Sequence, residues 1–206
     1  MECEKVLVYL RSMYPDQQLS LKYLTLKLTM LMALIQAARI QTLQLISAVG
    51  YRKTEEEFVF QLSDSLKQNR PNFNISLIAF KAYPPDRRLC VYSVIEEYLL
   101  RTQELRTSLK LQENSLLLSF VKPHKNVTRD TIARWLKIVM SKAGIDINQF
   151  GAYSVRAAAV SKAKEKGVPM SDILLKAGWS NESTFARFYH KPVLDNTDSF
   201  QRGVLT

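Results

Sequence analysis

The side chains best suited to chemistry lie in three short stretches near the C-terminus and at one arginine far upstream. The stretches read Gly151-Ala-Tyr-Ser-Val-Arg156, Lys176-Ala-Gly-Trp-Ser180 and Ala186-Arg-Phe-Tyr-His190. Tyr153 and Arg156 are three residues apart, so at the start of a helix their side chains are expected to share a face. The upstream residue, Arg39, follows an almost wholly apolar segment. A charge there is unusual for a packed helix junction unless the guanidinium points into a cleft.

The basic charge of the chain is concentrated in the same region. The 206 residues carry 29 Lys and Arg against 19 Asp and Glu, a formal net charge of +10. Residues 1–120 contain 15 basic and 12 acidic side chains, whereas residues 121–206 contain 14 and 7, so the net charges are +3 and +7. Such an excess indicates a surface for a polyanion, most simply nucleic acid, with a solvated basic surface as the alternative.

In this order, the residues resemble the pattern of the tyrosine recombinase (phage integrase) family in its catalytic domain. That family has an Arg after a buried helix, a Lys in a β-hairpin, a His/Lys/Tyr-x-x-Arg helix start, a Gly-His or Gly-Trp, and a Tyr nucleophile. The matching positions, between residues 19 and 191, are Arg39, Lys67, Tyr153 with Arg156, Trp179 and Tyr189. Lys81 is a rival to Lys67 for the hairpin position. The segments around Gln41-Thr42-Leu43, Lys67 and Phe188-Tyr189 look more like recombinases of eukaryotic mobile elements, of the Crypton or DIRS-like kind, than like bacterial ones.

The resemblance implies DNA strand cleavage and rejoining, as in site-specific recombination, integration or transposition, with no metal or other cofactor. Tyr189 would attack phosphorus in line to give a covalent 3′-phosphotyrosine, and Lys67 would protonate the departing 5′-oxygen. Arg39 and Arg156 would bind the phosphate because a guanidinium forks onto oxygen pairs and stays protonated. Trp179 would donate its indole N–H to a phosphate oxygen.

Two features depart from the family's pattern. Tyr153 stands where most members have His, and a phenol with an unperturbed pKa of about 10 donates a hydrogen bond but is a poor base at neutral pH. The chain also lacks room for a separate N-terminal DNA-clamping domain, so we expect either a fragment or a clamp reduced to residues 1–18. The basic side chains expected to hold the DNA backbone, in a salt-dependent way, are Lys122, Lys125, Arg129 and Arg134.

Other functions remain open beside strand transfer. One is a domesticated recombinase fold that binds DNA with weak or no cleavage, which the Tyr153 substitution would favour. Another is a DNA-relaxing enzyme similar to type IB topoisomerases, and a protein-only interaction module would leave the charge of +7 unexplained. The expected partners are double-stranded DNA and further copies of the chain, as a tetramer on paired sites. The expected location is the nucleus for a eukaryotic mobile element and otherwise the cytoplasm.

These residues must be positioned by a mainly helical α+β fold with a small antiparallel sheet in its first half. The sequence pattern predicts helices over residues 19–38, 39–45, 90–109, 128–143, 154–166, 172–177 and 182–188, and strands over 58–62 and 77–80. Thr128 is the predicted N-cap of the clearest amphipathic helix, which Gly144 ends, and Ser171 is the predicted N-cap of residues 172–177. Arg70-Pro71-Asn72 is typical of a turn.

Composition excludes several classes of protein. With 47% hydrophobic and 23% charged residues the chain is globular, and the apolar run Met30–Ile35 is too short to span a bilayer. Only Cys3 and Cys90 are present, which excludes a disulfide framework and indicates a reducing intracellular compartment. With two histidines, His124 and His190, they give no metal-ligand spacing. The predicted organisation is an N-terminal helical segment (1–18), a catalytic domain (19–193) and a tail (194–206) that is a candidate for docking on a partner.

Overall fold

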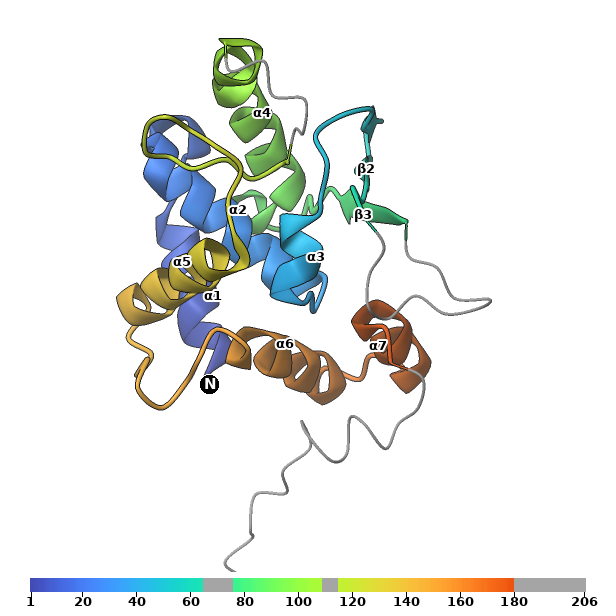
Figure 1. Ribbon diagram of the computed structural model, residues 1–206. Coiled ribbons are helices and arrows are strands. Elements are labelled where there is room, and N and C mark those ends of the chain that lie inside the picture. The colour runs from blue at the N-terminus through green and yellow to red at the C-terminus, as the bar shows by residue number, and fades with distance from the viewer. Residues whose placement is uncertain (65–75, 109–114, 180–206) are drawn as a thin grey trace, which may run out of the picture.

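The computed structural model describes residues 1–64, 76–108 and 115–179, and Figure 1 shows their arrangement. The helices gather on one side, the small sheet lies at the other, and α6 and α7 run along the lower edge (Figure 1). In chain order the elements are α1 (Cys3–Ser12), η1 (Asp16–Gln18), α2 (Leu21–Ile35), α3 (Ile40–Gln44), β1 (Arg52–Lys53), β2 (Glu57–Gln61), β3 (Leu77–Lys81), η2 (Arg87–Leu89), α4 (Val91–Ser108), α5 (Arg129–Lys142), α6 (Ser154–Glu165) and α7 (Met170–Ala177). The predicted α+β, mainly helical fold class with a small antiparallel sheet is confirmed.

Helix α2 is the centre of the core. It starts at Ser20, whose hydroxyl accepts a hydrogen bond from the backbone N–H of Tyr23, and residues 24–34 are buried on every face. Helices α4, α5 and α6 pack around it. Its one buried charge, Lys27, is wholly inaccessible to solvent and bonds to the Asp16 carboxylate and the Met13 carbonyl, both at 2.7 Å. The helix predicted over residues 19–38 is therefore present, but with shorter bounds.

The sheet is antiparallel in the order β1-β2-β3. Phe58 pairs with Phe80 and Phe60 with Ile78, and all four side chains are buried, as period-two alternation requires for a sheet with one covered face. The predicted strands 58–62 and 77–80 correspond to β2 and β3. Strand β1 was not predicted, because its two residues are both exposed and carry no apolar alternation.

The amphipathic helix α5 has the features predicted from its sequence. Thr128 is its N-cap and accepts from the N–H of Thr131, and Gly144 follows its end with φ +76°. The predicted apolar face is buried and consists of Ile132, Trp135, Leu136 and Val139. Local signals alone are sufficient for this element, because cap, stripe and terminating glycine all agree.

The predicted cap of the last described helix is wrong. Helix α7 begins at Met170 with Pro169 at the N-cap position, not at Asp172 with Ser171 as cap. The reason is that the Pro169 carbonyl already accepts the first helical hydrogen bonds, from the N–H groups of Asp172 and Ile173. Proline suits this place because it offers a carbonyl and needs no partner for an N–H. The predicted turn at residues 70–72, the helix 182–188 and the tail 194–206 lie outside the described residues.

The first 18 residues belong to the same core. Val6 and Leu10 of α1 are fully buried in the cluster that contains α2. Arg101 of α4 donates to the carbonyls of Gln17 and Leu19, which ties η1 to the helices behind it. Within the described ranges, no helix is long and apolar enough to cross a membrane.

Candidate active site

Arg39 follows the abrupt end of α2. Ala37 adopts a positive φ of +42°, and the chain then enters α3 through Arg39, which occupies the N-cap position with extended backbone. The Nη1 atom of Arg39 is buried and has no hydrogen-bond partner among the described residues. A guanidinium nitrogen removed from water without an acceptor costs free energy. Its position therefore indicates a place for an anionic ligand.

Arg156 lies in the first turn of α6 and is only 7% exposed. One of its terminal nitrogens donates to the Ala177 carbonyl at 2.7 Å, at the C-terminal end of α7, where the helix dipole favours a cation. Its guanidinium carbon lies 4.9 Å from the centre of the Trp179 ring, within the range of a cation–π contact. Both partners hold the guanidinium plane in one orientation.

Gly178 places Trp179 on this arginine. Gly178 adopts the left-handed conformation (φ 64°, ψ 42°) that glycine takes most readily at the end of a helix. The backbone N–H of Trp179 then donates a hydrogen bond to the Leu174 carbonyl at 2.9 Å. Helix α7 itself is held by a small apolar cluster separate from the main core, formed by Ala37, Val160, Ile173 and Ala177. The same cluster thus joins α6, α7 and the segment before Arg39.

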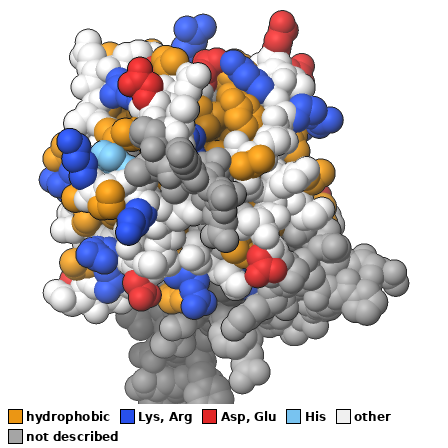
Figure 2. Space-filling view, turned by 45° about the horizontal axis from the view of Figure 1, so that its top comes forward, with side chains coloured by type: hydrophobic (Ala, Val, Ile, Leu, Met, Phe, Trp, Pro, Cys, Tyr) orange, Lys and Arg blue, Asp and Glu red, His pale blue; other side chains and the backbone are white. Residues whose placement is uncertain are grey.

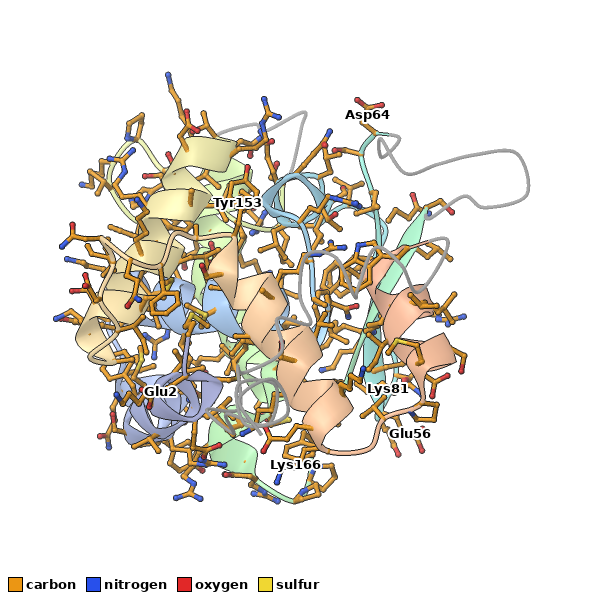
Figure 3. The ribbon with its side chains drawn as sticks, turned by 90° about the horizontal axis from the view of Figure 1, so that it is seen from below. Glu2, Glu56, Asp64, Lys81, Tyr153 and Lys166 are labelled. Carbon is orange, nitrogen blue, oxygen red and sulfur yellow. The ribbon has the colours of Figure 1, made fainter. Side chains whose placement is uncertain are left out.

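The two arginines, 117 positions apart in the sequence, line one pocket of about 510 Å³. Its walls come from the α2–α3 junction, the start of β3, α6 and the end of α7. Figure 3 shows this side of the molecule, with α6 running from Tyr153 towards Lys166 and α7 in front of the sheet near Lys81. The described residues that line the pocket are Gln36, Ala37, Ala38, Arg39, Thr42, Ser76, Leu77, Ile78, Ala79, Arg156, Leu175, Lys176 and Ala177, and none of these has a carboxylate.

Tyr153 is not placed with the arginines. It stands at the N-cap of α6, its side chain is 76% exposed, and it is not among the described residues that line the pocket. The expected common face with Arg156 is therefore not seen. Side chains lean towards the N-terminus of a helix, so a side chain at the cap extends past the helix end into solvent, whereas Arg156 leans onto covered surface.

Two predicted site residues lie outside the described residues, namely Lys67, in the connection between β2 and β3, and the candidate nucleophile Tyr189. Lys81, the rival to Lys67, is exposed at the end of β3 and is not among the residues that line the arginine pocket. Trp179 is half-buried against Arg156.

The predicted backbone-binding cations form an exposed group on the loop before α5 and on α5 itself. The group consists of Lys122, Lys125, Arg129 and Arg134, and none of the four makes an ion pair with another described residue. His124 lies in the same loop, and its Nδ1 is 2.9 Å from the Ser119 carbonyl. Figure 2 shows basic side chains on this face around the pale-blue histidine.

Lys176 lines the pocket and was not predicted from the sequence. It lies in the last turn of α7, and partial desolvation, followed by the nearby positive charge of Lys81, lowers its pKa. The only signal in the sequence was its place three residues before Trp179, and a lysine on a short helix is ordinarily solvated. Thr42 and Ser76 were also missed as pocket residues.

Comparison with solved structures identifies the fold. The chain is similar to the crystal structure of the XerH site-specific recombinase bound to difH substrate in a pre-cleavage complex, with a TM-score of 0.64 and 13% sequence identity. The match covers 96% of this chain and 51% of the XerH chain, so this chain spans about half the length of that protein. No protein-family model and no curated protein matches the sequence. This likeness confirms the tyrosine recombinase catalytic-domain fold.

Proposed function

We propose that this chain cleaves and rejoins double-stranded DNA through a covalent 3′-phosphotyrosine. The observation that carries the proposal is the pocket that brings Arg39 and Arg156 together, with no carboxylate among its described lining residues, within a tyrosine recombinase fold. The ordinary fate of a buried arginine is an ion pair with Asp or Glu. Two arginines that line one pocket, whose described walls contain no Asp or Glu, suit an anion supplied by a ligand.

The chemistry follows from the charge that develops during the reaction. Attack on a phosphodiester monoanion produces a pentacoordinate species with additional negative charge on the non-bridging oxygens. Arg39 and Arg156 would bind those oxygens, and each preorganised donor contributes roughly 3 kcal/mol by analogy with oxyanion-hole deletions. The bond from Tyr189 Oη to phosphorus would form as the bond to the 5′-oxygen breaks, with the hydroxyl proton of Tyr189 passing to water. Lys67 would give its proton to the departing 5′-oxygen and regain one from solvent. Rejoining is the reverse of these steps.

The wider assembly belongs to the same proposal. The XerH structure is a complex with DNA, and the exposed group of Lys122, Lys125, Arg129 and Arg134 would hold the DNA backbone here. We expect a tetramer on paired sites, with residues 194–206 docked on a neighbouring copy. Site-specific recombination, integration and transposition all use this chemistry. The resemblance to Crypton and DIRS-like recombinases favours a mobile element and a nuclear location.

Covalent trapping tests the proposal. Wild-type protein incubated with nicked suicide duplexes that contain the target site should give a protein–DNA adduct on a denaturing gel. Tyr189→Phe should give none, and the matched control Tyr14→Phe, which removes the hydroxyl of an exposed tyrosine on the loop after α1, should give the wild-type yield. An adduct that survives Tyr189→Phe would exclude Tyr189 as the nucleophile.

The exposure of Tyr153 favours a second candidate function, a recombinase fold that binds DNA with weak or no cleavage. With Tyr153 in solvent, the described pocket holds no side chain suited to take the proton of the attacking tyrosine at neutral pH. Binding and trapping on the same set of duplexes discriminate between the two functions. Binding of varied duplex sequences by wild type with no adduct on any of them would support the weak-catalyst interpretation, and an adduct on bound duplex would count against it.

A further inference from the structure

Lys176 adds a third positive charge to the arginine pocket. It precedes Ala177, whose carbonyl accepts the hydrogen bond from Arg156, and it lines the same 510 Å³ pocket as both arginines. The residue is exposed, so its side chain is accessible to a ligand that enters. Three cations and no carboxylate then surround this volume among its described lining residues, together with the hydroxyl-bearing Thr42 and Ser76.

Lys176 has no acidic partner among the residues that the structure describes. Asp172 precedes it by one helical turn, the usual spacing for an ion pair, but no such pair forms. A smaller pocket of about 270 Å³ is lined by both Lys176 and Asp172, the residue with which it forms no ion pair. An adjoining pocket of about 650 Å³, which Lys176 also lines, has one carboxylate among its described lining residues, that of Glu4. Glu4 is already bonded to Arg11 and Lys162. The protein therefore does not neutralise Lys176 from within its described part.

The neighbour of Lys176 is another cation. Lys81 lines the same adjoining pocket, and desolvation, followed by the positive charge of Lys81, lowers the pKa of Lys176. Two ammonium groups near each other repel unless an anion lies between or beside them. Lys176 lines the arginine pocket as well as the adjoining one, so its side chain borders the volume in which an anion bound by Arg39 and Arg156 would lie.

We propose that Lys176 binds the same DNA phosphate as Arg39 and Arg156 and stabilises the charge that develops on it during strand cleavage. This inference rests on the proposed function for its chemistry and extends the site to a residue outside the recombinase pattern. Lysine acts here as a point charge on the phosphate oxygens, whereas the arginines fix the geometry through their planar forks.

The first test compares the rates of adduct formation on the suicide duplex. Lys176→Met should be roughly 10- to 100-fold slower, the range for loss of a charge-assisted hydrogen bond. Lys176→Arg should retain most of the rate because it keeps the charge. The matched control Lys166→Met removes an exposed lysine of the adjoining pocket and should behave as wild type. A Lys176→Met rate equal to wild type would overturn the proposal.

The second test asks which phosphate Lys176 binds. Dissociation constants are measured in a Tyr189→Phe background for duplexes with either a normal phosphate or an uncharged methylphosphonate at the cleavage position. The penalty of Lys176→Met should vanish on the methylphosphonate duplex. A penalty that persists unchanged there would show that Lys176 binds another phosphate, which contradicts the proposal.

A third measurement does not depend on cleavage. The ¹⁵N NMR signal of the Lys176 ammonium group is followed while inorganic phosphate is added to the wild-type protein, and it should shift together with the Arg39 and Arg156 side-chain signals. If wild type forms no adduct, the proposed function fails, and this titration still decides the role of Lys176. A Lys176 signal that stays still while the arginine signals move would overturn it.

Discussion

Two positively charged side chains, Lys27 in the middle of α2 and Arg39 just beyond its end, differ in whether the protein supplies an acceptor for them. Lys27 is wholly buried, yet its ammonium group has the Asp16 carboxylate and the Met13 carbonyl at 2.7 Å and the Tyr14 ring at 5.8 Å. Arg39 has a buried guanidinium nitrogen with no partner among the described residues. A buried cation with acceptors from the protein itself stabilises the fold. A buried cation without such an acceptor is suited to bind an anionic ligand.

Arg106 and Arg156 show that cations differ by degrees in how far the protein itself satisfies them. Arg106 is satisfied by the Ser115 and Leu116 carbonyls, at 2.8 and 2.6 Å. One guanidinium nitrogen of Arg156 donates a hydrogen bond to the Ala177 carbonyl, and the side chain also lines the pocket. Its fixed partners orient the guanidinium beside a pocket whose described lining residues include no carboxylate. Substituting a cation that has acceptors in the protein, and one that has none among the described residues, should therefore have different effects.

The largest expected effect is on stability, at Lys27. Lys27→Met leaves the Asp16 carboxylate buried without its cation and should lower the free energy of unfolding by about 3–5 kcal/mol. Urea denaturation measures the loss. Lys22→Met, on the exposed side of the same helix, should change it by less than about 0.5 kcal/mol. Adding Asp16→Leu to Lys27→Met should recover much of the loss, and a single variant as stable as wild type would contradict the structural role of the pair.

Arg39 should show the opposite profile. Arg39→Met should slow adduct formation by about 10²–10³-fold, because a preorganised donor to the developing charge is lost. Circular dichroism should show the wild-type helical content. The control Arg52→Met removes an exposed arginine of β1 that lies 3.6 Å from Glu57. Equal rates for Arg39→Met and Arg52→Met would remove Arg39 from the site.

A smaller effect is expected at the exposed cations. Lys122→Ala removes a lysine without an ion pair among the described residues and should lower the slope of log affinity against log salt by about 0.9, the value for one phosphate contact. Lys5→Ala removes a lysine that already pairs with Glu2 at 2.9 Å and should leave the slope unchanged. Filter binding over a salt series measures both. Identical slopes for Lys122→Ala and wild type would exclude that contact.

The smallest effect concerns an exposed carboxylate. Hydrogen bonds from Lys162 first and Arg11 second lower the pKa of Glu4 below its ordinary 4.5. A carboxyl whose folded-state pKa is depressed stabilises the protein above the unfolded value, and this contribution is lost as pH falls through the folded pKa. The stability difference between wild type and Glu4→Gln should therefore be present near neutral pH and shrink on acidification. Glu55→Gln, at an exposed residue, should show no such change, and a Glu4→Gln difference that is constant with pH would contradict the assignment.

Elements whose signals are local were predictable from the sequence. In α5 the cap Thr128, the apolar stripe and Gly144 all pointed to the same boundaries. The start of α7 was mispredicted because Ser171 is a good cap by residue type, while the position that accepts the first hydrogen bonds is Pro169. Strand β1 was missed because edge pairing with β2, and not its own pattern, makes it a strand.

The site was predictable only in part, since it depends on contacts between distant segments. Arg39 and Arg156 were singled out by the family resemblance, but their meeting at one pocket requires the packing of α6 and α7 on the end of α2. The shared face of Tyr153 and Arg156 assumed that both residues lie inside the helix, and Tyr153 stands at its cap. Little in the sequence indicated Lys176 beyond its place three residues before Trp179, because its role depends on tertiary contacts with the arginine pocket and not on its own segment.

The unpartnered nitrogen of Arg39 has a thermodynamic consequence for the free protein. A desolvated donor without an acceptor destabilises the folded protein. An anion that accepts its hydrogen bond removes this destabilisation, so anion binding increases the stability of the fold. Phosphate-containing ligands should raise the melting temperature of wild type and do so less in Arg39→Met. Without ligand, the variant should melt at a temperature equal to or above that of wild type. Arg39 would then favour the reaction while lowering the stability of the ligand-free protein.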